Sequence, residues 1–482
     1  YNKDFEKIIN LDSKYKVNIS GKFQIMVLRA YENLGYIEKA EQYYEKIEQT
    51  LINNDSLGLC YINAENGYLL STEDSLFARA KYYAEKGFRF CPPGDRLSSL
   101  SHGVFIASTY ELEGAEAGKK AYYQLINNMD IKEKFDLTRS IGNAFSQSIN
   151  ETKFNLTYDD ALFYLNLAID LSKQLEAPKY FTPKYLTKAI YYYIRALNKA
   201  KGIGFASQKM EEQINEHCGG ALNIDCFHPH EKSSYLGALF YSEGAYNWAT
   251  RLFKFQINSI KLILAEEENI DKDDKEWSAN MLSTSHYRLG MIQLKQGNFK
   301  NARQDFYDAM ATTPKDLPFE KIWIESQFIK QRIGECYFKS QDYSNAIKIY
   351  RKLFNEKLKE DHDQFNNLGW EYSNLSMLAL SEFLSGQIDS AKVHFAQVEK
   401  KYNDIYDDTK KDKNYYYVQW PLYQFHSANG NTNKALRYIT DAYNHIPEDE
   451  RTEYLQDEKR MENLHKYYYI YEIIEAYNQN IR

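Results

Sequence analysis

Residues 289–314, LGMIQLKQGNFKNARQDFYDAMATTP, show the clearest pattern in the chain. Small residues alternate with aromatic residues through this stretch, at the spacing of two successive helices. Gly297 lies between the two and is expected to end the first helix in a left-handed cap. Gly290 in the first helix and Ala302 in the second leave room for the helices to approach closely. The stretch therefore predicts a pair of packed helices.

The same arrangement recurs in other parts of the chain. Small residues in both helices and aromatic or aliphatic residues between them return at matching separations, which predicts a stack of similar helix pairs. The further copies are Leu236-Gly237, Phe240, Gly244, Ala249 and Phe253; Ile333-Gly334, Tyr337, Ala346 and Tyr350; Leu378-Ala379, Gly386, Ala391 and Phe395; Leu422-Tyr423, Gly430, Ala435 and Ile439; and Tyr31, Leu34-Gly35, Ala40, Tyr44 and Ile47.

A weaker copy lies nearer the amino terminus. Ile141-Gly142 and Phe145 are typical of a first helix, and Ala161, Leu165 and Ala168 complete the pair after a longer turn. The pattern between residues 50 and 230 is therefore expected to form divergent helix pairs rather than a different fold.

The motif resembles the tetratricopeptide repeat, whose signature runs Leu-Gly, Tyr, Ala, Phe and Pro through a helix-turn-helix unit. The resemblance implies an all-α fold, an α-α superhelix of the right-handed helical-solenoid type, with about nine helix pairs. Copies that start at Gly237, Gly290, Gly334, Ala379 and Tyr423 are 53, 44, 45 and 44 residues apart, where the family has 34. Longer repeats of this kind resemble those of bacterial signalling regulators.

One continuous solenoid is expected over residues 1–482, since no Ser- or Gly-rich linker divides the chain. Within it we expect divergent repeats in 1–201, an irregular insertion in 202–232, well-matched repeats in 233–450 and a capping or connecting helix in 451–482.

The composition excludes several classes of protein. Hydrophobic residues make up 43% of the chain and there are only 22 Gly and 9 Pro, so disordered and collagen-like chains are excluded. The net charge of −7 would repel a phosphate backbone, and nucleic acid is not expected as a partner. No run of 18 apolar residues occurs, so we expect no membrane insertion by this chain. The start at Tyr1 rather than Met indicates a processed chain or a fragment.

The cysteine content leaves few sites for chemistry. Five Cys, an odd number, do not predict a disulfide framework, and they slightly favour a cytoplasmic location. We predict no catalytic residue, because no phosphate-binding loop and no hydrolase or metalloprotease motif occurs.

One concentrated set of His and Cys remains as a weak candidate for zinc. Its spacing fits no familiar zinc motif, so neither a metal nor another cofactor is predicted. A Cys218–Cys226 disulfide stays open if the protein is exported. The members of the set are His217, Cys218, Cys226, His228 and His230.

A stack of helix pairs presents one face lined by the first helices, and such a face suits an extended peptide or a partner helix. The function predicted from the resemblance is a non-catalytic protein- or peptide-binding scaffold or ligand-sensing module, part of a bacterial signalling protein. The alternative is the regulatory repeat region of a larger enzyme, a kinase or a caspase-like protease, whose catalytic domain lies outside this chain.

The predicted binding residues flank the packing residue of each first helix, and several of them could instead only contact the neighbouring repeat. Relatives that bind chaperone tails carry a Lys, Asn and Arg clamp at these positions. Only Arg29 is cationic among the matching positions of the well-matched copies, so such a ligand is not expected. The predicted binding residues are Tyr287, Met291, Gln331, Glu335, Phe338, Phe383, Trp420 and Gln424.

Overall fold

The computed structural model describes most of the chain, and it describes only helices, turns and loops. None of the helices in the described part has the length and apolarity needed to cross a membrane. The described residues are 5, 7–9, 21–51, 55–72, 75–92, 95–148, 156–175, 182–229, 231–266, 272–314, 326–356, 364–405, 416–446 and 470–481.

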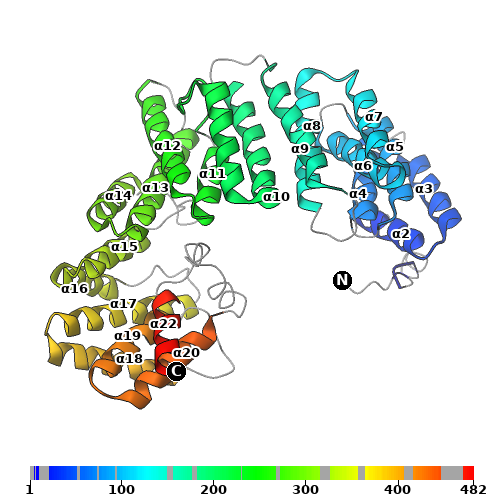
Figure 1. Ribbon diagram of the computed structural model, residues 1–482. Coiled ribbons are helices and arrows are strands. Elements are labelled where there is room, and N and C mark those ends of the chain that lie inside the picture. Colours follow the sequence, from blue (N-terminus) through cyan, green and yellow to red (C-terminus); the bar gives the residue numbers. More distant parts are fainter. Residues whose placement is uncertain are drawn as a thin grey trace. The chain divides into compact units, whose positions relative to one another are not determined.

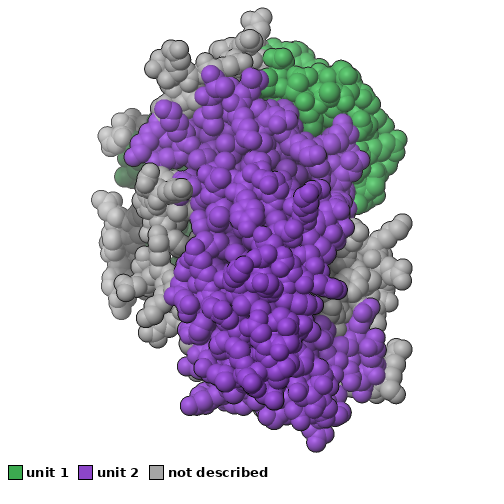
Figure 2. Space-filling model, turned by 90° about the vertical axis from the view of Figure 1, so that its left-hand side faces the viewer, with its two compact units in different colours: residues 1–228 green, residues 229–482 purple. Residues whose placement is uncertain are grey.

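The chain forms two compact units, residues 1–228 and residues 229–482, which are coloured separately in Figure 2. The boundary falls inside the predicted insertion at 202–232, and the continuity of the stack across it stays a prediction. The helices of unit 1 are α2 (Gly21–Asn33), α3 (Ile37–Leu51), α4 (Ser56–Thr72), α5 (Phe77–Phe90), α6 (Arg96–Glu113), α7 (Ala115–Ile126), α8 (Ile131–Ser148), α9 (Tyr158–Ser172) and α10 (Thr182–Cys218) (Figure 1).

Unit 2 repeats the same plan with well-matched copies of the motif. Its helices are α11 (Glu231–Ser242), α12 (Tyr246–Glu266), α13 (Lys272–Lys295), α14 (Phe299–Thr312), α15 (Ser326–Lys339), α16 (Tyr343–Asn355), α17 (Gln364–Leu384), α18 (Ile388–Ile405), α19 (Tyr416–Ala428), α20 (Thr432–His445) and α22 (Ile470–Ile481).

Helices pack in consecutive pairs, and the pairs stack on one another. Within pairs, α4 packs on α5, α8 on α9, and α13 on α14. Between pairs, the first helices also touch: α4 packs on α6, α6 on α8, and α17 on α19. The predicted all-α solenoid of helix pairs is confirmed, and the first helices of neighbouring pairs form a layer of their own.

The small residue of each first helix is needed for close packing. A Cβ atom added to Gly290 would lie 2.7 Å from the ring of Phe306, and one added to Gly237 would lie 2.6 Å from the ring of Phe253. Each ring stands sixteen residues after its glycine, and both rings are fully buried. The interpretation of these glycines as points of close helix approach is confirmed.

The turn inside each pair also stands at a fixed place. The residue seven positions after the packing residue has a positive φ, 74° at Gly297 and 85° at Gly386. In the copy that starts at Gly334 this place is held by Gln341, with a φ of 61°. A side chain other than Gly is strained there, because the left-handed region brings Cβ close to the backbone.

The first copy has the same turn. Gly35 has a φ of 73° and precedes Ala40 by five residues, as Gly297 precedes Ala302. Counting back seven residues from Gly35 gives Leu28, which is fully buried, as the packing residue of α2. Arg29 therefore stands one residue after the packing residue, as Met291 does after Gly290.

The predicted irregular stretch at 202–232 is shorter in the structure. Helix α10 bends at Gly202, where φ is 81°, and then continues to Cys218. Ala206, Met210 and Ile214 recur every four residues and are fully buried, so this segment has a helical apolar face. The non-helical part runs from residue 219 to residue 229.

Two disulfides contradict the expectation from the cysteine count. Cys60 of α4 pairs with Cys91 after α5, and Cys218 pairs with Cys226, while Cys336 is free and buried. Disulfides form in oxidising compartments, so the support that the cysteine count gave to a cytoplasmic location is removed.

Candidate functional site

A groove of about 570 Å³ lies on the first-helix layer of unit 1. Three successive first helices form its walls: α4, α6 and α8. Helix α4 contributes its carboxyl-terminal end. The groove therefore follows the direction in which the repeats stack. Polar residues of its walls include Tyr68, Ser71, Arg96, Ser99, Asp136, Arg139, Ser140, Asn143 and Gln147.

Local capping fixes the two helices that carry most of the groove. Helix α6 begins after Asp95, whose carboxylate accepts a hydrogen bond of 2.7 Å from the backbone N–H of Leu97. Before α8, Asp130 and Glu133 accept hydrogen bonds from each other's backbone N–H, at 2.8 and 3.1 Å. Such reciprocal caps satisfy N–H groups at the start of a helix and set where its side chains point.

The floor of the groove is apolar. Val104 of α6 and Ile141 and Phe145 of α8 are each at most 5% exposed. Tyr68 of α4 lies at the rim and is 42% exposed. An apolar floor between polar walls is the usual composition of a ligand site in a protein.

Arg139 is the most tightly placed cation of the groove. Its guanidinium lies 3.5 Å from a carboxylate oxygen of Asp136, donates to the hydroxyl of Ser140 at 3.2 Å and stands over the ring of Tyr192, 5.2 Å from its centroid. Its Nε is buried and has no hydrogen-bond acceptor within the described part of the chain. The side chain is thus held in place while part of its donor capacity is unused.

The groove wall carries a net positive charge. Asp136 is shared, since Lys188 also lies 3.9 Å from it, and Arg96 is 87% exposed at the opening, 3.8 Å from Glu65. The charged residues that line the groove are thus two arginines and one aspartate. This arrangement favours a ligand that carries a carboxylate.

The predicted binding residues lie on the first helices of unit 2. Tyr287 and Met291 are on α13, and Gln331, Glu335 and Phe338 are on α15. Phe383 is on α17, and Trp420 and Gln424 are on α19.

The structure joins several of these residues to neighbouring repeats. Arg332 donates to the hydroxyl of Tyr287 at 3.2 Å and lies 3.4 Å from Glu335, which is only 3% exposed. The Gln331 amide donates to Asn374 on α17 at 3.4 Å. These contacts tie α13, α15 and α17 together in unit 2.

The aromatic members pack both within a repeat and between repeats. The rings of Phe383 and Phe425 have centroids 5.5 Å apart, and Trp420 is 9% exposed and packs 5.4 Å from Tyr423. The ring of Phe338 lies 5.7 Å from that of Tyr343. A role of this face in binding stays a prediction.

The groove residues of unit 1 were missed, although a spacing in the sequence points to them. Tyr287 and Met291 stand three residues before and one residue after the packing glycine Gly290. The same spacing around Gly142, where an added Cβ would lie 2.6 Å from the side chain of Leu165, leads to Arg139 and Asn143. Both line the groove, and the weak match of this repeat concealed them.

The two cysteines of the His and Cys cluster near residue 220 are not available to a zinc ion. Cys218 and Cys226 are joined in a disulfide, which leaves no thiolate to bind a metal. His217 is hydrogen-bonded to Gln213 at 3.2 Å, and the backbone N–H of His228 donates to Thr187 at 2.8 Å. His230 lies outside the described residues.

Comparisons with known proteins agree with this architecture. Family models of the tetratricopeptide repeat match residues 22–48, 283–316 and 331–356. No curated protein sequence matches the chain significantly.

Two solved structures illustrate the likeness. The apo form of the quorum sensor NprR from B. thuringiensis has 11% identity and a TM-score of 0.36, over 91% of this chain and 100% of that chain. A chain of the Naa15/Naa10 structure with bound HypK-THB has 14% identity and a TM-score of 0.28, over 98% of this chain and 79% of that chain. Models of the tetratricopeptide repeat thus match three segments of a chain whose fold is a helical solenoid of the tetratricopeptide-repeat type.

Proposed function

We propose that the groove on α4, α6 and α8 binds an extended acidic peptide segment of a protein partner, and that the chain is an interaction scaffold. The observation that carries the proposal is the groove itself, which crosses three successive first helices of unit 1. Tetratricopeptide repeats are generally non-catalytic interaction scaffolds, so binding is the function that this fold favours.

The dimensions and the lining of the groove support a peptide. A volume of about 570 Å³ is in the ordinary range for a ligand site. Asn143 and Gln147 on one wall offer amide groups to the main chain of a peptide, and Ser99 on the other wall offers a hydroxyl. The buried floor of Val104 and Phe145 offers apolar contact to its side chains.

The charge of the groove supports an acidic residue or a free carboxyl terminus in the ligand. Arg139 has a buried Nε without an acceptor, and a guanidinium binds a carboxylate through two parallel hydrogen bonds. We extend the proposal to a signalling role, in which the bound peptide is the signal that the protein recognises. The absence of a nucleic-acid partner stays a prediction from the net charge of −7.

Fluorescence anisotropy tests the proposal with labelled peptides that differ only in having Asp and Glu or Asn and Gln. The wild-type protein is expected to prefer the acidic peptides. Arg139→Gln is expected to weaken their binding by about tenfold or more, because hydrogen bonds to charged groups contribute about 1.5–3 kcal/mol. Asn143→Ala removes a neutral partner and should have a smaller effect.

Two controls locate the site. Arg437→Gln removes an exposed arginine of α20 and should leave binding unchanged. Gln331→Ala combined with Met291→Ala alters the first-helix face of unit 2 and should also have no effect. If that pair abolishes binding while Arg139→Gln leaves it intact, the ligand binds unit 2 and the assignment to the groove is wrong.

A further inference from the structure

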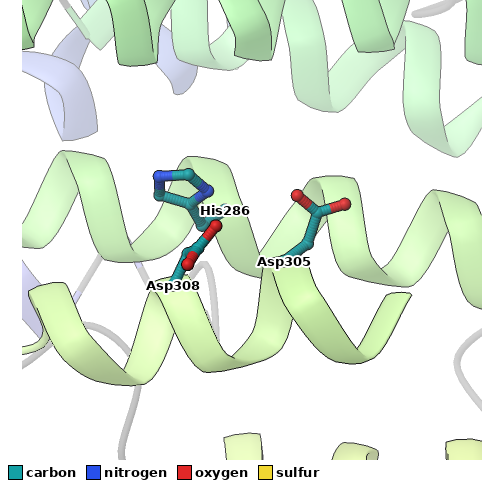
Figure 3. A group of neighbouring side chains, drawn as sticks. All are labelled: His286, Asp305 and Asp308. Atoms are coloured by element: carbon teal, nitrogen blue, oxygen red, sulfur yellow. The ribbon is translucent and has the colours of Figure 1, made fainter. Parts of the chain in front are cut away.

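A second group of polar side chains lies in unit 2. His286 is on α13, and Asp305 and Asp308 are on α14, the helix that packs against it. Figure 3 shows the two carboxylates pointing from α14 toward the helix that carries His286. One donor atom from each side chain lies within 4.8 Å of those from the other two.

The two helices bring these donors together for a simple reason. Asp305 and Asp308 are three residues apart, so they stand on the same face of α14. The small residues Gly290 and Ala302 hold α13 and α14 close, and this places His286 opposite the two aspartates. The cluster is therefore built by the packing of the repeat itself.

The imidazole of His286 is buried without a partner for one of its nitrogens. The residue is 6% exposed, and its Nδ1 has no hydrogen-bond partner within the described residues. A buried polar atom with no partner costs free energy unless something binds it. This observation is independent of the two carboxylates, and it concerns a side chain that has a ring nitrogen within 4.8 Å of them.

The two carboxylates also lack full compensation. Within the described residues no ion pair joins Asp305 or Asp308 to a cation, and Asp308 receives one hydrogen bond, 3.0 Å long, from the amide of Gln304. A bound cation would neutralise this pair.

We propose that His286, Asp305 and Asp308 bind one divalent transition-metal ion, with Zn²⁺ as the best fit. One imidazole nitrogen with two carboxylate oxygens is a ligand set that zinc accepts, whereas Mg²⁺ and Ca²⁺ prefer oxygen alone. Three protein ligands leave a fourth position for water or for a group of a partner.

Binding requires the donors to move somewhat closer. Metal–ligand distances of about 2.0–2.2 Å place tetrahedral ligands within about 3.5 Å of one another. Rotation about the last side-chain bond of an aspartate is soft, so the carboxylates can close on the ion without moving the helices.

The cysteines offer no competing site. Four of the five are paired in disulfides. The fifth, Cys336, is buried, and burial raises the pKa of its thiol to about 12. A zinc ion bound by the oxidised protein would therefore have no thiolate ligand in this chain.

Equilibrium dialysis of the untagged full chain against ZnCl₂, followed by elemental analysis, tests the proposal. The wild-type protein is expected to bind one equivalent of zinc. Asp305→Asn and Asp308→Asn keep the shape of the side chain and should each weaken zinc binding by at least about tenfold. Loss of a group that only hydrogen-bonds a metal ligand already lowers metal affinity by about 10- to 100-fold, so loss of a ligand should cost no less. Asp404→Asn, an exposed change of equal charge in unit 2, should bind zinc as the wild type does.

Circular dichroism of each variant separates loss of binding from loss of fold, and His286→Gln provides a third ligand change. In the wild type zinc should raise the melting temperature, because it binds only the folded state, and in the folded Asp305→Asn variant it should not. The proposal is wrong if the wild type retains no zinc, or if Asp305→Asn and Asp308→Asn both bind it as tightly as the wild type.

Discussion

The residues with a positive φ explain where the sequence of this protein is well matched to its fold and where it is not. Gly244, Gly297, Gly386 and Gly430 end their first helices at φ values between 72° and 85°. Gln341 occupies the same place at 61°. An L-residue pays about 1–2 kcal/mol in the left-handed region, so this repeat carries local strain that its neighbours lack.

Replacement of this residue gives the first prediction. Gln341→Gly is expected to raise the free energy of unfolding by up to about 1 kcal/mol, because Gly adopts the left-handed region without a Cβ contact but loses more entropy on folding. Urea unfolding followed by circular dichroism measures the change. Gly297→Gln, the reverse change in the preceding repeat, should destabilise; equal stability of both variants would contradict the assignment of strain.

The packing glycines give a second prediction at the same scale. Gly290→Ala should destabilise by about 1–2 kcal/mol, since its Cβ would lie 2.7 Å from the buried ring of Phe306, which outweighs the gain in helix propensity. Gly204→Ala is the matched control, because nothing lies within 4 Å of its Cβ position, and it should stabilise by up to about 1 kcal/mol. Thermal unfolding measures the change in stability of each variant. If close packing were unimportant, both substitutions would raise the melting temperature.

At the scale of the element, the contact of α5 with α6 includes a buried titratable group. The imidazole of His102 on α6 stacks on Phe88 of α5, with ring centroids 4.5 Å apart. Burial lowers its pKa, while a hydrogen bond with the backbone of Ser98 acts in the opposite direction. The neutral form of this histidine is therefore the one that fits between the helices.

This burial predicts how stability depends on pH. Below about pH 6.5 His102 takes up a proton more readily in the unfolded chain than in the folded chain, because its pKa is lowered by folding. The free energy of unfolding therefore decreases as the pH falls below about 6.5, and above that pH His102 makes it neither larger nor smaller with pH. The slope from one group is at most about 1.4 kcal/mol per pH unit. Unfolding at pH 5 and pH 7.5 should show a smaller loss for His102→Gln than for the wild type, and an identical loss would exclude this cause.

At the scale of the whole molecule, the two disulfides both lie in unit 1 and none lies in unit 2. The loop closed by Cys60 and Cys91 spans 31 residues, for which the chain-entropy model gives about 3–4 kcal/mol of stabilisation. Because repeats contact mainly their neighbours, the units are expected to unfold in separate transitions.

A reductant should therefore shift only one of these transitions. Calorimetry with and without dithiothreitol is expected to show a lower melting temperature for unit 1 and no change for unit 2. Alkylation of the denatured chain provides the control, with one labelled thiol before reduction and five after it. More than one labelled thiol before reduction would mean that a disulfide does not form.

The sequence was sufficient to predict the helix pairs, because Gly290 and Ala302 pack as their spacing indicates and Gly297 ends the helix between them. It was insufficient for the disulfides, since the pairing of Cys60 with Cys91 depends on α4 and α5 lying side by side. The groove depends on how the first helices of different pairs pack, and the His286 cluster on which side chains face each other within one pair. The repeat motif identifies the packing residues, but it does not specify which polar side chains come together.

The constant spacing from packing residue to turn and to buried ring has a consequence for the history of the chain. Gly290 and Gly334 occupy the same position in successive repeats, 44 residues apart. An in-frame duplication or deletion of 44 residues therefore joins equivalent positions of neighbouring repeats. Unequal recombination within the gene would lengthen or shorten such an array by a whole repeat, and the spacing of the packing residues in the other repeats would stay the same. The number of repeats can thus change by duplication, and an added repeat brings new surface residues while it uses the same packing residues in its core.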